Sequence, residues 1–138
     1  MRNLILAVTL LLVTISTHAQ IHWEGGTYEA ALQKAKQENK IIFIDVYADW
    51  CAPCKRMDYN VYNKRSVGNY YNRNFINIKV DSDNRLGKIL DRKFNIQYLP
   101  GYLFINGDEE VIYKSSSYKA VDSFISLGKR AQNRFLNF

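Results

Sequence analysis

The sequence has only two cysteines, two prolines and two histidines in its 138 residues. The cysteines, Cys51 and Cys54, have two residues between them, so they can close a small disulfide ring or lie side by side as thiols. The only histidines, His18 and His22, lie near the amino terminus, which argues against a zinc site. Haem attachment would require a histidine directly after the second cysteine, and Lys55 occupies that position. We therefore expect no metal and no organic cofactor.

Long runs of like charge are also missing, although the formal net charge is +6. The Lys and Arg residues are scattered, which is typical of a solvated basic surface, with a functional basic patch as the alternative. We expect no nucleic-acid binding. Hydrophobic residues make up 47% and charged residues 23%, which is a normal globular balance, and the length suits one domain.

The amino terminus resembles a secretory signal peptide. Arg2 precedes the apolar run Leu4–Ile15, and a small residue, Ala19, follows where cleavage would occur. An apolar run of this length suits a signal and is short for a membrane span. We predict a signal peptide over residues 1–19 and a mature domain over 20–138, exported to the periplasm or secreted, where disulfides persist. An uncleaved anchor is the alternative.

The two cysteines lie where a buried strand is expected to turn into a helix. The apolar run Ile41–Tyr47 predicts a strand covered on both faces, and Lys55–Tyr62 is predicted to be helical. Pro53 suits a first helical turn, where its missing N–H removes no hydrogen bond. If Cys51 caps the helix, free backbone N–H groups and the positive end of the helix dipole face its sulfur.

Such a position favours the thiolate of Cys51, and the thiolate is the nucleophile. Cys54 falls on the same helical face, one turn deeper. We expect Cys51 to be the exposed attacking thiol and Cys54 the shielded resolving thiol, with Trp50 flanking the sulfur as an apolar platform. The alternative is a purely stabilising disulfide, but a loop this short closes little chain entropy and would stabilise little.

Asp45 interrupts the apolar strand before the cysteines. A carboxylate there is costly unless it has a partner or a role. One interpretation places Asp45 at the strand end, bonded to a loop. The functional interpretation is a buried acid below the cysteines, with a pKa raised by loss of hydration, that takes or returns the proton of Cys54.

Hydrophobic periodicity predicts the element order α-β-α-α-β-α-β-β-α. A hairpin after βα units indicates an α/β fold with a central mixed sheet and helices on both faces. The other predicted helices are one capped by Thr27 and ended by Asn39, and those over Ser66–Arg73, Leu86–Phe94 and Val121 to about Arg134. The other predicted strands are Phe75–Val80 and a hairpin of Tyr102–Ile105 and Val111–Tyr113 around Asn106-Gly107. A turn is predicted over Asp81–Asn84 and a loop over Ser115–Ser117.

The run from Asp45 to Lys55, Asp-Val-Tyr-Ala-Asp-Trp-Cys-Ala-Pro-Cys-Lys, resembles the active-site stretch of the thioredoxin family. The resemblance extends over nearly all of the predicted mature chain and implies the thioredoxin fold. It implies that Asp45 is the family's buried acid and that Lys55 is the lysine after the cysteine pair. Pro100 would fill the place of the family's cis-proline. The residues implied in substrate binding are Trp50, Pro53, Leu99 and Pro100.

Two departures lie in the segment that would line the substrate groove. Thioredoxins usually have a threonine where this chain has Gly101, and a small residue where it has Tyr98. Substrate preference therefore does not carry over from ordinary thioredoxins. The helix over Ser66–Arg73 is more similar to exported thioredoxin-like proteins, including the carboxyl-terminal domain of the bacterial transmembrane thiol–disulfide electron conveyor.

These observations predict an exported, monomeric thiol–disulfide oxidoreductase that reduces disulfides of exported proteins. Its substrates would be protein thiols and disulfides, and a membrane or soluble redox partner would supply electrons. One alternative is a thioredoxin-fold chaperone or binding module with an idle disulfide. Another is a thiol reductant in cytochrome c maturation, acting on apocytochrome Cys-x-x-Cys-His sites.

Overall fold

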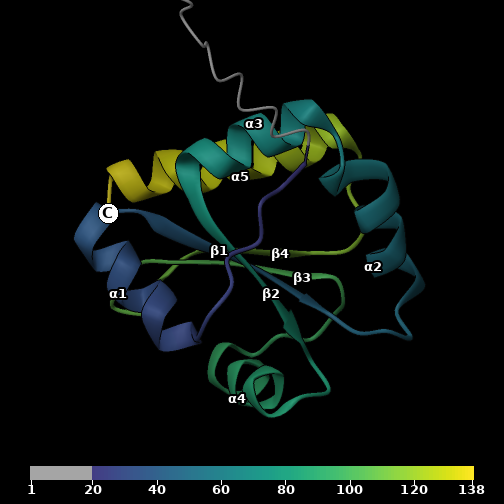
Figure 1. Ribbon diagram of the computed structural model, residues 1–138, viewed down its shortest axis with the longest axis horizontal. Helices are drawn as coiled ribbons and strands as arrows, with labels where there is room; N and C mark the ends of the chain where they lie inside the picture. Colours follow the sequence, from purple (N-terminus) through teal and green to yellow (C-terminus); the bar gives the residue numbers. More distant parts are fainter. Residues whose placement is uncertain (1–19) are drawn as a thin grey trace, which may run out of the picture.

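The computed structural model describes residues 20–138, so the predicted signal peptide lies outside the described residues. A sheet separates two layers of helices, with one short helix at the end of the sheet (Figure 1). The elements are α1 (Tyr28–Glu38), β1 (Ile41–Tyr47), α2 (Ala52–Met57), a π-helical turn η1 (Asp58–Tyr62), α3 (Arg65–Asn74), β2 (Phe75–Asp81), α4 (Arg85–Phe94), β3 (Gly101–Ile105), β4 (Val111–Ser116) and α5 (Val121–Leu136).

The sheet is mixed, as predicted, with strand order β2-β1-β3-β4. β1 pairs parallel with β2, whereas β3 is antiparallel to both β1 and β4. The central strand β1 therefore has a neighbour on each side and helices over each face, which explains its continuous apolar sequence. In this register Asp45 of β1 lies opposite Lys79 of β2 and Tyr102 of β3.

Alternate side chains of the sheet enter two separate cores. One face packs on α3, α5 and η1, and the other packs on α1 and α4 (Figure 1). Phe43 and Phe104 enter the first core, whereas Ile42 and Ile44 enter the second. This division follows from the period of two along a strand.

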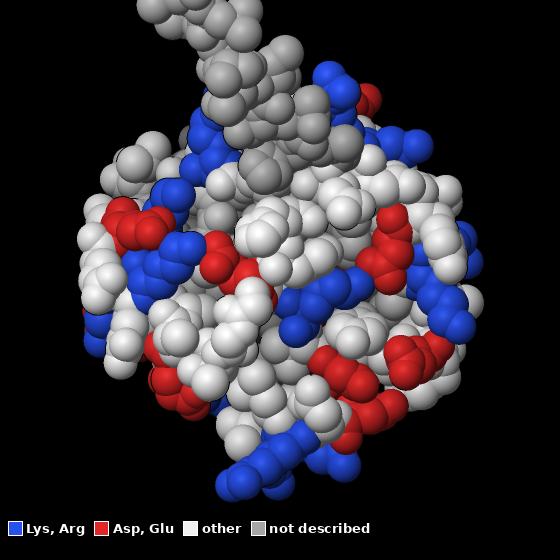
Figure 2. All heavy atoms as spheres, in the orientation of Figure 1, with Lys and Arg blue, Asp and Glu red and all other residues white. Residues whose placement is uncertain are grey.

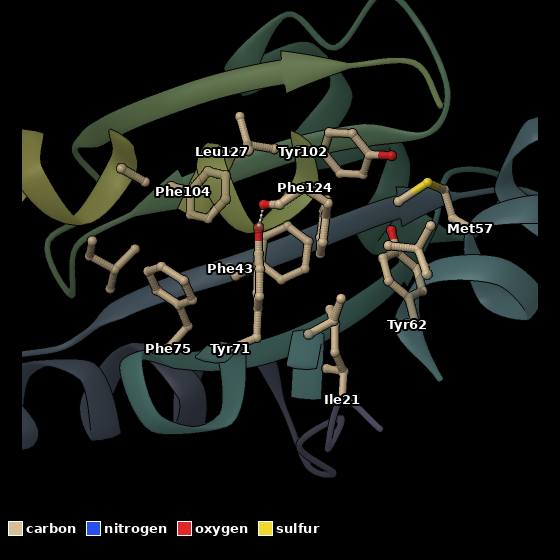
Figure 3. Packing of buried hydrophobic residues seen from close by; sticks show 14 of the residues in the cluster. Ile21, Phe43, Met57, Tyr62, Tyr71, Phe75, Tyr102, Phe104, Phe124 and Leu127 are labelled. Atoms are coloured by element: carbon tan, nitrogen blue, oxygen red, sulfur yellow. Dashed lines mark hydrogen bonds between the residues drawn. The ribbon is translucent and has the colours of Figure 1, made fainter. Parts of the chain in front are cut away.

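The first core is built largely from aromatic rings (Figure 3). The rings of Tyr71 and Phe124 are stacked with their centroids 4.4 Å apart. Phe43 lies edge-on to both rings. The buried Tyr71 hydroxyl donates a hydrogen bond of 2.8 Å to the backbone carbonyl of Phe124, so its polar atom is satisfied.

Residues Gln20–Gly26 run along α3 and β2 rather than forming a free lead-in. The Ile21 side chain is buried in the first core. Its N–H donates to the Tyr62 carbonyl at 2.9 Å, and the Glu24 N–H donates to the Asn77 carbonyl at 2.8 Å. These contacts fix the amino-terminal segment of the described chain against the fold.

Several predicted boundaries were wrong. The helix after the cysteines begins at Ala52, in agreement with a Cys51 cap and with Pro53 in the first turn, but its last turn is the wider η1 rather than an α-helix. Ser66 lies inside α3, whose cap position is Lys64. Ser115 and Ser116 belong to β4, because they pair with Tyr102 and Gly101 rather than forming a loop.

Lys and Arg side chains alternate with Asp and Glu over the face shown in Figure 2. Ion pairs link several of them, including Lys36 with Asp108 and Lys93 with Glu109. Within residues 20–138, no helix has the length and apolar character needed to cross a membrane.

Candidate active site

Cys51 and Cys54 form a disulfide at the start of α2, with their Cα atoms 5.3 Å apart. Cys51 is the helix cap, as predicted, and its sulfur accepts a hydrogen bond of 3.2 Å from the Cys54 N–H. Pro53 lies in the first turn. The sulfur of Cys51 therefore faces the amino-terminal end of a helix, which is the environment that stabilises a thiolate when the disulfide is reduced.

The expectation that Cys51 is exposed is wrong for this disulfide state. Cys51 is 4% exposed and Cys54 is 3% exposed. The sulfurs are bonded to each other, and Ala48, Tyr47 and Leu99 pack around them. A substrate atom that reaches Cys51 must therefore approach through the rim formed by these side chains.

A surface hollow of about 310 Å³ opens beside Cys54. Lys55, the lysine after the cysteine pair, lines it, and so does the exposed Asp49. Asp58 and Tyr59 of η1 form the opposite side. The hollow therefore borders Cys54, which is itself buried, as predicted for the shielded thiol.

Trp50 stands at the rim of the site with 71% of its surface exposed. Its indole N–H donates a hydrogen bond of 2.9 Å to the Asp83 carboxylate, in the turn after β2. This bond orients a large apolar ring next to the disulfide while leaving its faces open to a partner.

The peptide bond between Leu99 and Pro100 is cis, as the resemblance implied. Leu99 packs against the disulfide, and Pro100 is buried. At Gly101, a Cβ would lie 2.7 Å from the side chain of Ile96 and 3.2 Å from the Tyr98 carbonyl. This crowding explains why glycine occurs here in place of the threonine usual in thioredoxins. Tyr98 itself is exposed at the rim.

Asp45 is only 1% exposed and has two partners. The Tyr62 hydroxyl donates to Oδ1 at 2.8 Å, and the Lys79 ammonium lies 3.6 Å from Oδ2. Burial raises the pKa of Asp45 from 3.8 to about 6, against the opposing effects of Lys79 and Tyr62. The predicted burial of Asp45 is confirmed, whereas proton exchange with Cys54 stays a prediction. The strand-end interpretation is wrong, because both partners come from η1 and β2, not from a loop.

Lys79 is held by carboxylates and by aromatic rings. Its ammonium donates to Asp58 and lies over the rings of Trp23, Tyr47 and Tyr62, at 5.3, 4.7 and 5.4 Å from their centroids. Such cation–π contacts stabilise a partly buried cation. The charge opposite Asp45 is therefore fixed in place.

The sequence analysis missed the partners of Asp45. One signal was present, because Lys79 interrupts an otherwise buried strand and Asp45 interrupts the neighbouring one. In the parallel register these two residues lie opposite each other. Tyr62 gave no such signal, since its inward direction depends on the π-helical turn.

Among the described residues, no group of three His, Cys, Asp or Glu side chains is arranged to hold a metal ion.

Comparisons with known proteins identify the family. A profile described as thioredoxin-like matches residues 22–107. The chain is 35% identical over 87 residues to thioredoxin H4 of Arabidopsis thaliana, covering 63% of this chain and 69% of that protein. It is 32% identical over 85 residues to an H-type thioredoxin of Oryza sativa subsp. indica, covering 60% of this chain and 63% of that protein. The matched region thus spans slightly less than two thirds of the rice protein.

Solved structures show the same fold. A proposed disulphide isomerase from Bacteroides thetaiotaomicron superimposes with a TM-score of 0.73 and 31% identity, covering 83% of this chain and 94% of that one. The oxidised C-terminal domain of Neisseria meningitidis DsbD gives a TM-score of 0.64 at 23% identity, covering 80% of this chain and 98% of that one.

The chain therefore belongs to the thioredoxin-like family. Its fold and its redox-type cysteine pair make the described domain a thioredoxin-like thiol–disulfide oxidoreductase.

Proposed function

We propose that the protein is an exported reductase of disulfides in other exported proteins. The observation that carries this proposal is the Cys51–Cys54 disulfide at a helix amino terminus, together with the buried, ionisable Asp45 in the adjoining strand. An idle structural disulfide needs neither a helix cap nor a buried acid.

In the reaction, the Cys51 thiolate attacks one sulfur of a substrate disulfide. The substrate S–S bond breaks, its other sulfur leaves as a thiolate, and a mixed disulfide forms. Cys54 then loses its proton to Asp45 and attacks the Cys51 sulfur, which releases the second substrate sulfur. The substrate gains two electrons, and its two thiolates take up one proton that Asp45 returns and one from solvent. The protein keeps the Cys51–Cys54 disulfide. A dithiol partner, soluble or in a membrane, must reduce that disulfide again.

Aromatic side chains around the site favour a polypeptide substrate. Trp50 and Tyr98 are exposed on segments next to the disulfide, and Tyr118 is exposed in the loop after β4, under the guanidinium of Arg56. Aromatic rings and arginine are enriched in protein interfaces. The substrate chain would lie across them and bond to the backbone of Leu99 by strand addition.

Replacing Cys54 with Ser tests the proposal. The variant is expected to accumulate mixed disulfides through Cys51, because the resolving thiol is absent. These adducts should appear on non-reducing gels of the exported fraction and disappear with dithiothreitol. Cys51→Ser is the matched control and should form none. If Cys54→Ser turns over disulfides normally, the proposed mechanism is wrong.

If the variant lacking both cysteines still suppresses aggregation of unfolded proteins, a chaperone would replace the reductase as the primary function. Trapping of apocytochromes alone would narrow the substrate to cytochrome c maturation.

Export is supported by the charged, apolar and small-residue pattern of residues 1–19. Sequencing the amino terminus of protein recovered from the exported fraction should give Gln20 as the first residue. A product that retains Met1 in the membrane fraction would indicate an uncleaved anchor instead.

A further inference from the structure

The buried acid of this site has a hydroxyl partner as well as a cation. The Tyr62 hydroxyl donates to Asp45 Oδ1 at 2.8 Å, and both residues are buried. A hydrogen bond donated to a carboxylate stabilises its ionised form, and it does so more strongly where water is excluded. Tyr62 therefore acts on the group proposed to receive the Cys54 proton.

The fold holds Tyr62 in this orientation from several sides. The π-helical turn η1 buries both Val61 and Tyr62. The Tyr62 carbonyl accepts the Ile21 N–H, and its ring packs on Trp23 and Phe124, with centroids 5.2 and 5.4 Å away. The hydroxyl is thus fixed by the amino-terminal segment and α5 as well as by its own turn.

Other charged and titratable groups face Asp45 from each neighbouring strand. Lys79 approaches from β2, and Asp58 of η1 shares that ammonium. Tyr102 approaches from β3 with a buried hydroxyl that has no hydrogen-bond partner among the described residues. Tyr47 lies on the same strand as Asp45. Of these groups, Lys79 forms the ion pair, whereas Tyr62 supplies the neutral donor.

We propose that Tyr62 is a positioning residue that stabilises ionised Asp45 and thereby sets the pH range in which Asp45 accepts the proton of Cys54. This inference rests on the proposed function. Burial alone would hold Asp45 protonated to higher pH, and the donor moves ionisation back toward neutral conditions. The hydroxyl thus adds to the effect of Lys79 and widens the pH range in which the buried acid is available as a base.

Tyr62→Phe is the test, because it removes the hydroxyl and keeps the ring. Losing a hydrogen bond to a buried carboxylate should raise the pKa of Asp45 by about one pH unit. The ionised fraction would then fall about fivefold at pH 6 and about twofold at pH 7. Two readouts apply to the mature chain: the Asp45 carboxyl titration by 13C NMR, and the pH profile of Cys54-dependent release of a preformed mixed disulfide.

Tyr71→Phe is the matched control, because it removes a buried hydroxyl from the same core, where the bond goes to the Phe124 carbonyl. We expect Tyr71→Phe to lower stability without moving either profile. The Tyr62→Phe substitution should also leave the release profile unchanged in an Asp45→Asn background, since no carboxyl remains there to titrate.

The inference is supported if both readouts move to higher pH in Tyr62→Phe and neither moves in Tyr71→Phe. It is overturned if the Asp45 titration stays in place, if both variants move it equally, or if the release profile does not follow it. Failure of the proposed function would look different, because the wild-type protein itself would then show no thiol–disulfide exchange.

Discussion

Asp45 is buried, and burial makes its ionisation costly in the folded protein. Its pKa is raised from 3.8 to about 6 by burial, so the folded state binds the proton more tightly than the unfolded state. Folding is therefore most favourable below pH 4, becomes less favourable as pH rises from 4 to 6, and changes little above that from this group. At neutral pH the buried, ionised Asp45 lowers the free energy of unfolding by about 3 kcal/mol at most.

Asp45→Asn should remove that cost. Asparagine can still accept the Tyr62 hydroxyl, so we expect the unfolding free energy of the oxidised protein at pH 8 to rise by about 1–3 kcal/mol. The loss of the pairing with Lys79 reduces the gain. Urea unfolding at pH 8 and at pH 4 measures the unfolding free energy of both proteins. The difference between Asp45→Asn and wild type should vanish at pH 4. Asp49→Asn is the control, because Asp49 is an exposed carboxylate nearby. An Asp45→Asn protein that is less stable than wild type at pH 8 would contradict the argument.

At the scale of single residues, the sequence predicted the burial of Asp45 but not the side chains that contact its carboxyl group. Burial follows from its place inside an apolar strand, which is local information. Its partners Tyr62 and Lys79 lie 17 and 34 positions further along the chain. Only the strand register and the shape of η1 bring them to the carboxyl.

At the scale of single elements, η1 is the feature that local pattern did not predict. An α-helix through Lys55–Tyr62 would place apolar residues every three or four positions. The observed π-helical turn instead buries two consecutive residues, Val61 and Tyr62, one of which bonds to Asp45. Widened turns of this type often occur at functional sites. Intrinsic propensities contain no term for them, so only the tertiary packing reveals the turn.

The position of the amino-terminal segment was likewise not predicted by local pattern. Gly25 and Gly26 break any periodic pattern there, so no element was predicted. The segment is nevertheless fixed, because Ile21 enters the core and the backbone passes very close to α3. At Gly68 of α3, a Cβ would lie 2.6 Å from the Gln20 carbonyl oxygen. This close approach depends on a residue far away in the sequence.

For the whole molecule, the predicted order of elements indicated a mixed sheet with helices on both faces, and the resemblance of the run from Asp45 to Lys55 to thioredoxins implied the particular fold. A buried strand within βα units and a later hairpin leave few ways to arrange a mixed sheet with helices on both faces. The strongest predictions came from residues with few physical roles, such as Cys51, Cys54 and Pro100. The direction of electron flow has no comparable signature, because it depends on the relative stability of two redox states of the entire domain.

The reduction potential of the Cys51–Cys54 pair decides that direction. The Ala-Pro dipeptide between the cysteines is close to the Gly-Pro of thioredoxins, and the buried Asp45 is shared with reducing members, so we expect a value near about −270 mV. Equilibration of the mature chain with glutathione buffers, followed by thiol alkylation, measures it, and the variant with both Cys51→Ser and Cys54→Ser gives the unmodified baseline. A value near about −120 mV would make the protein an oxidant that donates disulfides to exported clients, and would contradict the proposed reductase. A potential near that of thioredoxin lies below the poise of an oxidising compartment. An exported protein with that potential would stay reduced only while a partner delivers electrons to it.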